Sequence, residues 1–253
     1  MIEEQHFRLE WDFSPDDFLE YELVDEVNRS TINVSAGKIV VLAPDDGTDT
    51  QVIVERTQAV VTLLFQCARI YRRGRYTTSG PSVMRIHENG KRDYVVLPDS
   101  VTVFWGKPGF DFIVHDQQGK MIFDSATDRK SKKMALTSVA LKIQETNPIV
   151  KFALSAFNSS IEQPENELIH LYEIRDAAKR YFGNSELAKS GLPICNKLWS
   201  RFGHLTSNAP LKQGRHRGFR YEDLRDATEK ELEEVRTIAR AILQRLFEHI
   251  ARK

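Results

Sequence analysis

The spacing of apolar residues changes near the middle of the chain, and this change limits the folds that are open to it. Along residues 6–13, polar and apolar side chains alternate from His6 and Phe7 onward, which is the pattern of a strand with one buried face. Beyond residue 128 the apolar residues recur at helical intervals instead. The sequence therefore predicts an α+β protein with three parts: an antiparallel β-rich domain with one helix (residues 1–128), a helical connection (129–164) and a helical bundle (165–253).

The first part is expected to be a sheet whose strands are short apolar runs between turn signals. The dipeptides Asn89-Gly90 and Gln118-Gly119 suit hairpin turns, because Gly and Asn accept positive φ. Apolar residues at helical spacing predict one helix over residues 57–72, with a buried strand as the alternative. The expected strands after the first are residues 19–27, 31–34, 38–42, 83–87, 94–97, 101–105, 110–115 and 121–123.

The second half is predicted to be helical to its end. Thr228 and Glu231 have the spacing of a capping box, which marks the start of a last long helix. Gly183 stands where a helix C-terminus needs a residue that tolerates the left-handed conformation. The other expected helices are residues 128–143, 148–159, 168–182, 185–189 and 193–202.

Charge is balanced over the chain as a whole, with 36 Lys and Arg against 36 Asp and Glu. This balance excludes a protein that coats polyanions over its whole surface, so nucleic-acid binding would need a local patch. Cys67 and Cys195 lie in apolar surroundings and read as reduced thiols. No secretory signal is visible, and the longest apolar run, residues 59–70, is too short to span a bilayer. We expect a soluble, cytoplasmic protein with no membrane partner.

The loop at residues 211–225 gathers the most suggestive side chains. Between Ala209 and Tyr221 it holds no acid. Arg binds phosphate through several planar donors, and His exchanges protons near neutral pH. The loop therefore predicts a phosphate-binding or phosphodiester-cleaving site, formed by Lys212, Arg215, His216, Arg217 and Arg220. The alternative is that the Arg side chains tie the loop to nearby acids, namely Glu173, Glu222, Asp223 and Asp226.

Two further basic runs occur earlier in the chain. Arg72, Arg73 and Arg75 lie at the end of the first predicted helix with tyrosines between them, a mixture that could bind nucleic acid. Cations at a helix C-terminus also interact well with its dipole, and we favour this simpler reading. The run at residues 129–133 is interpreted as a solvated helix start.

Metal and cofactor motifs are missing from the sequence. There is no Gly-rich phosphate loop with Lys-Ser/Thr, no dinucleotide fingerprint, no Gly-x-Ser-x-Gly elbow and no paired-His helix. His170 and His216 could meet in space, although a helix histidine is more often a surface or core residue. We expect no metal and no cofactor.

The last third of the chain carries a family resemblance. Residues 166–253, with NELIHLYEIRDAAKRYFG, a short Trp-containing helix, NAPLKQGRHRG and a long final helix, resemble a family of uncharacterised bacterial proteins. More distantly they resemble HEPN domains. That resemblance implies a homodimer through the C-terminal helices. It also implies RNA or nucleotide binding, or metal-independent ribonuclease activity in a defence or toxin–antitoxin setting. In HEPN domains the signature His follows an Arg by several residues, whereas here Arg215 directly precedes His216.

Taken together, these features predict binding of RNA or a nucleotide-like phosphate by the basic loop. The alternative is a metal-independent ribonuclease, in which His216 exchanges a proton and Arg215 or Arg217 stabilises the transition state. A further alternative is a non-catalytic structural or protein-interaction component.

Overall fold

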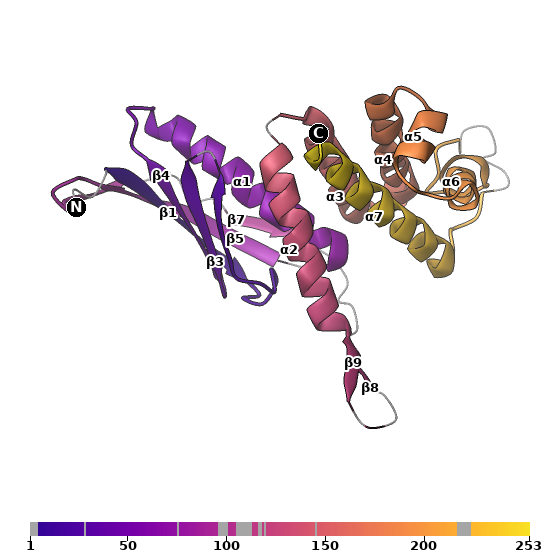
Figure 1. The fold of residues 1–253 in the computed structure, drawn as a ribbon, viewed down its shortest axis with the longest axis horizontal. Helices are drawn as coiled ribbons and strands as arrows, with labels where there is room; N and C mark the ends of the chain where they lie inside the picture. Colours follow the sequence, from indigo (N-terminus) through magenta and orange to yellow (C-terminus); the bar gives the residue numbers. More distant parts are fainter. Residues whose placement is uncertain are drawn as a thin grey trace. The chain divides into compact units, whose positions relative to one another are not determined.

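The computed structural model describes residues 5–27, 29–74, 76–95, 101–104, 113–115, 118, 120–144, 146–216 and 224–253 (Figure 1). The chain forms two compact units, Met1–Leu141 and Lys142–Lys253. An N-terminal antiparallel sheet is followed by helices, which confirms the α+β prediction. The segment expected as a helical connection, residues 129–164, is distributed between the two units.

The sheet of the first unit has the strand order β2-β3-β4-β1-β5-β6, with β7 also paired to β5. The paired strands of this sheet run antiparallel, and β1 lies between β4 and β5. The strands are β1 (His6–Ser14), β2 (Leu23–Val27), β3 (Ser30–Ser35), β4 (Lys38–Pro44), β5 (Tyr76–Ile86), β6 (Arg92–Val95) and β7 (Val101–Phe104).

One face of this sheet packs against helix α1 (Thr50–Tyr71). The apolar residues of β1 are buried as their alternation predicts, with Leu9 at 0% and Trp11 at 1% exposure. The indole N–H of Trp11 donates to Gln58 Oε1 at 2.9 Å on α1. Burial of each such large side chain stabilises the fold by about 1.5–3 kcal/mol. The helix is confirmed, but it begins earlier than residue 57 because Asp49 caps its first turn.

The predicted strand over residues 19–27 was wrong at its start, since β2 begins at Leu23. Phe18 and Leu19 lie in a loop, but their side chains are buried in the core. This burial explains why the stretch has the apolar content of a strand. Glu20 has φ 62°, a left-handed conformation that is incompatible with a strand. The predicted hairpin at Asn89-Gly90 is confirmed, with positive φ at Gly90.

Helix α2 (Ser125–Ile143) contacts the loop that contains Phe18 and Leu19. The hydroxyls of Tyr21 and Thr137 lie 3.1 Å apart in the core of the first unit. A two-stranded hairpin of β8 (Ile113–His115) and β9 (Met121–Asp124) leads into α2. Its predicted turn at Gln118-Gly119 lies partly outside the described residues.

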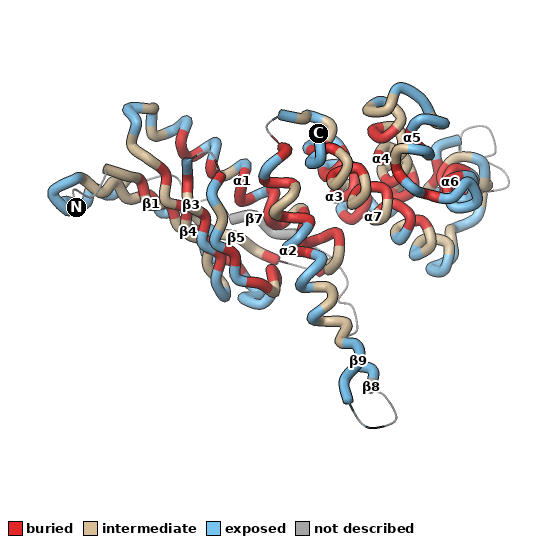
Figure 2. The backbone as a smooth tube through the Cα atoms, viewed as in Figure 1, coloured by how far each residue is buried: buried red, intermediate tan, exposed pale blue. Residues whose placement is uncertain are grey.

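The second unit is a helical bundle. Figure 2 shows buried positions recurring along its long helices, and α4 packs between α3 and α7. The predicted capping box of the last helix is confirmed, since Thr228 and Glu231 satisfy one another's backbone N–H groups. Gly183 ends α4 with φ 97°, also as predicted. The helices are α3 (Pro148–Glu162), α4 (Glu167–Phe182), α5 (Ser185–Gly191), α6 (Asn196–Gly203) and α7 (Glu229–Ala251), with a π-helical turn at His204–Asn208.

Among the described helices, none combines the length and the apolar content needed to cross a membrane.

Candidate anion-binding site

The structure places Arg215, from the basic loop, against helix α4. Its Cζ lies 4.1 Å from the centroid of the Tyr172 ring, a cation–π contact. Its Nη1 lies 3.7 Å from Asp176 Oδ2. Asp176 is therefore an acid near Arg215 that was not among the partners suggested by the sequence. Two of those partners, Glu222 and Asp223, lie outside the described residues.

Backbone hydrogen bonds hold the described start of the loop, residues 211–216. The Arg215 N–H donates to Thr206 O at 3.0 Å, and the Gly214 N–H donates to Leu211 O at 3.0 Å. A Cβ at position 214 would lie 3.2 Å from Leu211 O, so a glycine suits this tight turn. The two ends of the loop are joined where the Lys212 N–H donates to Arg225 O at 3.0 Å. Arg215 is thus presented to α4 from a constrained backbone.

Arg175 lies in the same place and was not singled out from the sequence. Its Cζ is 4.8 Å from the ring centroid of Trp199 on α6 and 5.6 Å from that of Tyr172. Burial lowers the pKa of its guanidinium. Its Nε is buried and has no hydrogen-bond partner within the described part of the chain. Gly203 leaves room for it, because a Cβ there would lie 1.9 Å from Arg175 Nη1.

Lys179 completes the group. Its Nζ donates to Tyr172 Oη at 3.2 Å and to Asp176 Oδ1 at 2.7 Å. Positions 172, 175, 176 and 179 lie on one face of α4, because residues three or four apart are neighbours on a helix. We call this group the Tyr172 cluster: Tyr172, Arg175, Asp176, Lys179 and Arg215. Its three cations and one carboxylate give a formal charge of +2.

The other predicted loop residues have different positions. Lys212 Nζ lies 3.0 Å from Asp226 Oδ2 at the surface, as the structural alternative anticipated for this loop. His216 is exposed and directly follows Arg215. Arg217 and Arg220 lie outside the described residues.

The far end of the loop is anchored to the last helix. The Arg225 guanidinium donates to both carboxylate oxygens of Glu231, at 2.6 and 2.8 Å. This ion pair, together with the hydrogen bonds from Thr228, holds the pKa of Glu231 at about 2.

In the first unit, one arginine of the predicted basic patch, Arg72, is paired with acids. Arg72 Nη1 lies 3.3 Å from Asp17 Oδ2 and 3.5 Å from Glu20 Oε1. Arg73 is half-buried, and Arg75 lies outside the described residues.

The structure gathers a second set of cations here, which we call the Glu20 cluster: Asp17, Glu20, Arg72, Arg129 and Lys133. Arg129 Nε lies 3.1 Å from each oxygen of the Glu20 carboxylate. Lys133 Nζ donates to the same carboxylate and to Phe18 O. Burial disfavours ionisation of Glu20, but the hydrogen bonds from Arg129 and Lys133 prevail and lower its pKa.

Lys133 corrects the prediction of a solvated helix start over residues 129–133. Its side chain is 0% exposed, and burial lowers its pKa to about 8. Lys130 and Lys132 are exposed, as predicted. Only part of the run is therefore a solvated face.

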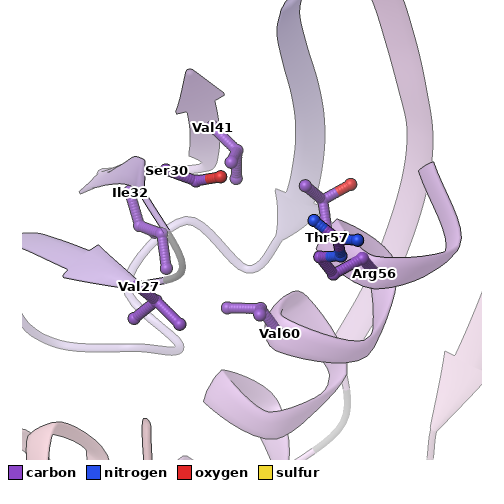
Figure 3. A pocket seen from close by; sticks show the side chains of 7 residues that line it. All are labelled: Val27, Ser30, Ile32, Val41, Arg56, Thr57 and Val60. Carbon is purple, nitrogen blue, oxygen red and sulfur yellow. The ribbon is translucent and has the colours of Figure 1, made fainter. Parts of the chain in front are cut away.

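A small pocket lies between the sheet and α1 in the first unit, as Figure 3 shows. Its volume is about 10 Å³, roughly what one water molecule needs. The hydroxyl of Thr57 is engaged there, since it donates to Ile53 O at 2.8 Å. The pocket is too small for a nucleotide. Its lining is Val27, Ser30, Ile32, Val41, Arg56, Thr57 and Val60.

Within the described residues, no group of three or more His, Cys, Asp or Glu is placed to hold a metal ion. His170 instead contacts Glu173 at 3.3 Å and Gln163 Oε1 at 3.1 Å. Comparisons of the chain with protein-family models, with curated proteins and with solved structures gave no significant match.

Proposed function

We propose that the Tyr172 cluster binds the phosphate groups of RNA or of a nucleotide-like ligand. The observation that carries this proposal is Arg175, a half-buried cation whose Nε has no partner among the described residues. A buried charge is unfavourable unless an opposite charge and hydrogen bonds compensate it. A bound phosphate supplies both to a guanidinium.

The other two cations of the cluster are accessible to a ligand. The side chains of Arg215 and Lys179 are 38% and 26% exposed. Their positive charge is concentrated at this cluster, because the chain as a whole has a formal net charge of zero. An anion would therefore be attracted to this face of α4 and not to the molecule in general.

Binding of short labelled single-stranded RNA, followed by fluorescence anisotropy at low salt, tests the proposal. Arg175→Ala and Arg215→Ala should each weaken binding about tenfold, since a charge-assisted hydrogen bond contributes about 1.5–3 kcal/mol. The matched control is Arg252→Ala, which removes a cation that is 80% exposed at the end of α7. It should change the affinity by less than about twofold.

Arg175→Lys separates charge from geometry, because lysine keeps the charge but lacks the planar fork. It should retain part of the affinity. Circular dichroism of each variant checks that the bundle is intact, and Lys179→Gln provides a surface variant that is less able to disturb packing. Equal affinity in the wild type, Arg175→Ala, Arg215→Ala and Lys179→Gln would overturn the proposal.

A metal-independent ribonuclease is the second candidate, because the exposed imidazole of His216 directly follows Arg215. In this reading His216 exchanges a proton with the RNA 2′-hydroxyl or the leaving oxygen. Incubation with labelled RNA in excess chelator should then give cleavage that His216→Ala abolishes. Binding without such cleavage leaves the binding function alone.

A further inference from the structure

We infer that the Tyr172 cluster recognises the sugar–phosphate backbone of a single strand and does not read its bases. This inference rests on the proposed function and specifies its ligand. It follows from how the aromatic rings of the cluster are already used. Proteins that contact the bases of a single strand need an aromatic face on which a base can stack.

Three cations of the chain already lie over the Tyr172 ring. The Arg215 Cζ lies 4.1 Å from its centroid, and the Lys179 Nζ and Arg175 Cζ lie 5.0 and 5.6 Å from it. A base would have to displace Arg215, the cation best placed to meet a phosphate. Cation–π contact and base stacking therefore compete at this ring.

The Trp199 ring is buried and also in contact with other side chains. It is 2% exposed, its indole N–H donates to Ser185 Oγ at 3.0 Å, and Arg175 lies over its ring. Both aromatic rings thus hold guanidinium groups in place. The rings act as supports for cations and not as platforms for bases.

The charge of the cluster sets the number of phosphates that it can neutralise. Three cations share Asp176, so about two positive charges remain for phosphates. For a single strand, each neutralised phosphate contributes about −0.7 to the slope of log K against log salt, which gives a slope of about −1.4. Arg215→Ala should reduce the magnitude of this slope by about 0.7.

The experiment compares single-stranded oligomers of one length: oligo-U, oligo-A, an abasic ribose-phosphate chain and oligo-dT, with inorganic pyrophosphate as competitor. We expect the four affinities to agree within about threefold and to share one salt slope. Pyrophosphate should compete, but more weakly than the oligomers, because its charges are not spread along a strand.

Four outcomes are decisive. A preference of more than about tenfold for any base-containing oligomer over the abasic chain overturns the inference and leaves the proposed function standing. Binding to none of the oligomers overturns both. Phe219 and Tyr221 lie outside the described residues, so the Phe219→Ala/Tyr221→Ala variant is measured as well. Unchanged affinity for oligo-A supports the inference, and a loss that the abasic chain does not show overturns it.

Discussion

The Glu20 cluster and the Tyr172 cluster each bring three cations together, but they differ in the acids that meet them. In the first unit, two carboxylates share Arg72, Arg129 and Lys133. In the second unit, a single carboxylate among the described residues, that of Asp176, contacts Lys179 and Arg215. The comparison teaches that basic residues identify a candidate anion site only after their carboxylate partners have been counted.

The same comparison assigns the two clusters different roles. In the Glu20 cluster a carboxylate of the chain itself occupies the place between the cations, so the cluster joins α2 to the loop before β2. In the Tyr172 cluster the buried Nε of Arg175 has no hydrogen-bond partner among the described residues. The first cluster stabilises the fold, and the second is where we place a ligand.

The largest expected effect is on stability, from Glu20→Ala. It leaves Lys133, whose side chain is 0% exposed, without its carboxylate, and breaking a buried ion pair destabilises by about 3–5 kcal/mol. Hydrogen exchange of α2, with urea unfolding, measures the loss. The control is Glu10→Ala, which removes a surface partner of Arg8 and Lys38. Its loss of unfolding free energy should be about 1 kcal/mol at most. Equal losses in both variants would contradict a structural role for the Glu20 cluster.

A smaller effect is expected from Gly203→Ala, which changes no charge. The new Cβ would lie 1.9 Å from Arg175 Nη1, so the guanidinium must move. We expect RNA affinity to fall about tenfold. The double variant Gly203→Ala/Arg175→Ala should bind no more weakly than Arg175→Ala alone, because both changes act on the same side chain. Additive losses would show that Gly203 acts elsewhere.

The smallest effect is a pH dependence at the end of the basic loop. The pKa of Glu231 is about 2 in the folded protein against an ordinary value of 4.5, mainly because Arg225 donates to it. A lowered carboxyl pKa stabilises the fold fully above 4.5, and this stabilisation is lost as the pH falls from 4.5 toward about 2. Glu231→Gln should flatten the thermal stability profile over that window. An unchanged profile would show that the pair contributes nothing.

Local pattern predicted much of the fold. The alternation around Leu9 and Trp11 gave the central strand and its buried face, and the Thr228–Glu231 spacing gave the start of α7. Pattern failed where a distant contact decided the outcome. Glu20 was predicted to lie in a strand, although its backbone is left-handed. Lys133 was predicted to be solvated, although its side chain is buried and paired with Glu20. Glu20 and Lys133 are far apart in the sequence, so no local pattern shows their contact.

The candidate site was predicted in part for the same reason. Arg215 was proposed from its loop, whereas Arg175 and Lys179 lie in α4, about forty residues earlier. Their spacing from Tyr172 on one helix face could have identified them, because positions three, four and seven residues apart share a face. Their meeting with Arg215 is a tertiary contact and leaves no local signal. The HEPN resemblance and the homodimer stay predictions.

The most direct test of the central claim is a parallel measurement of RNA affinity for Arg72→Ala and Arg175→Ala. Each substitution removes one arginine from one cluster, so net charge changes equally in both. The account predicts that Arg175→Ala binds about tenfold more weakly than the wild type, while Arg72→Ala stays within about twofold. Equal weakening by the two substitutions would contradict it, because binding would then follow total charge and not the position of Arg175 in the Tyr172 cluster.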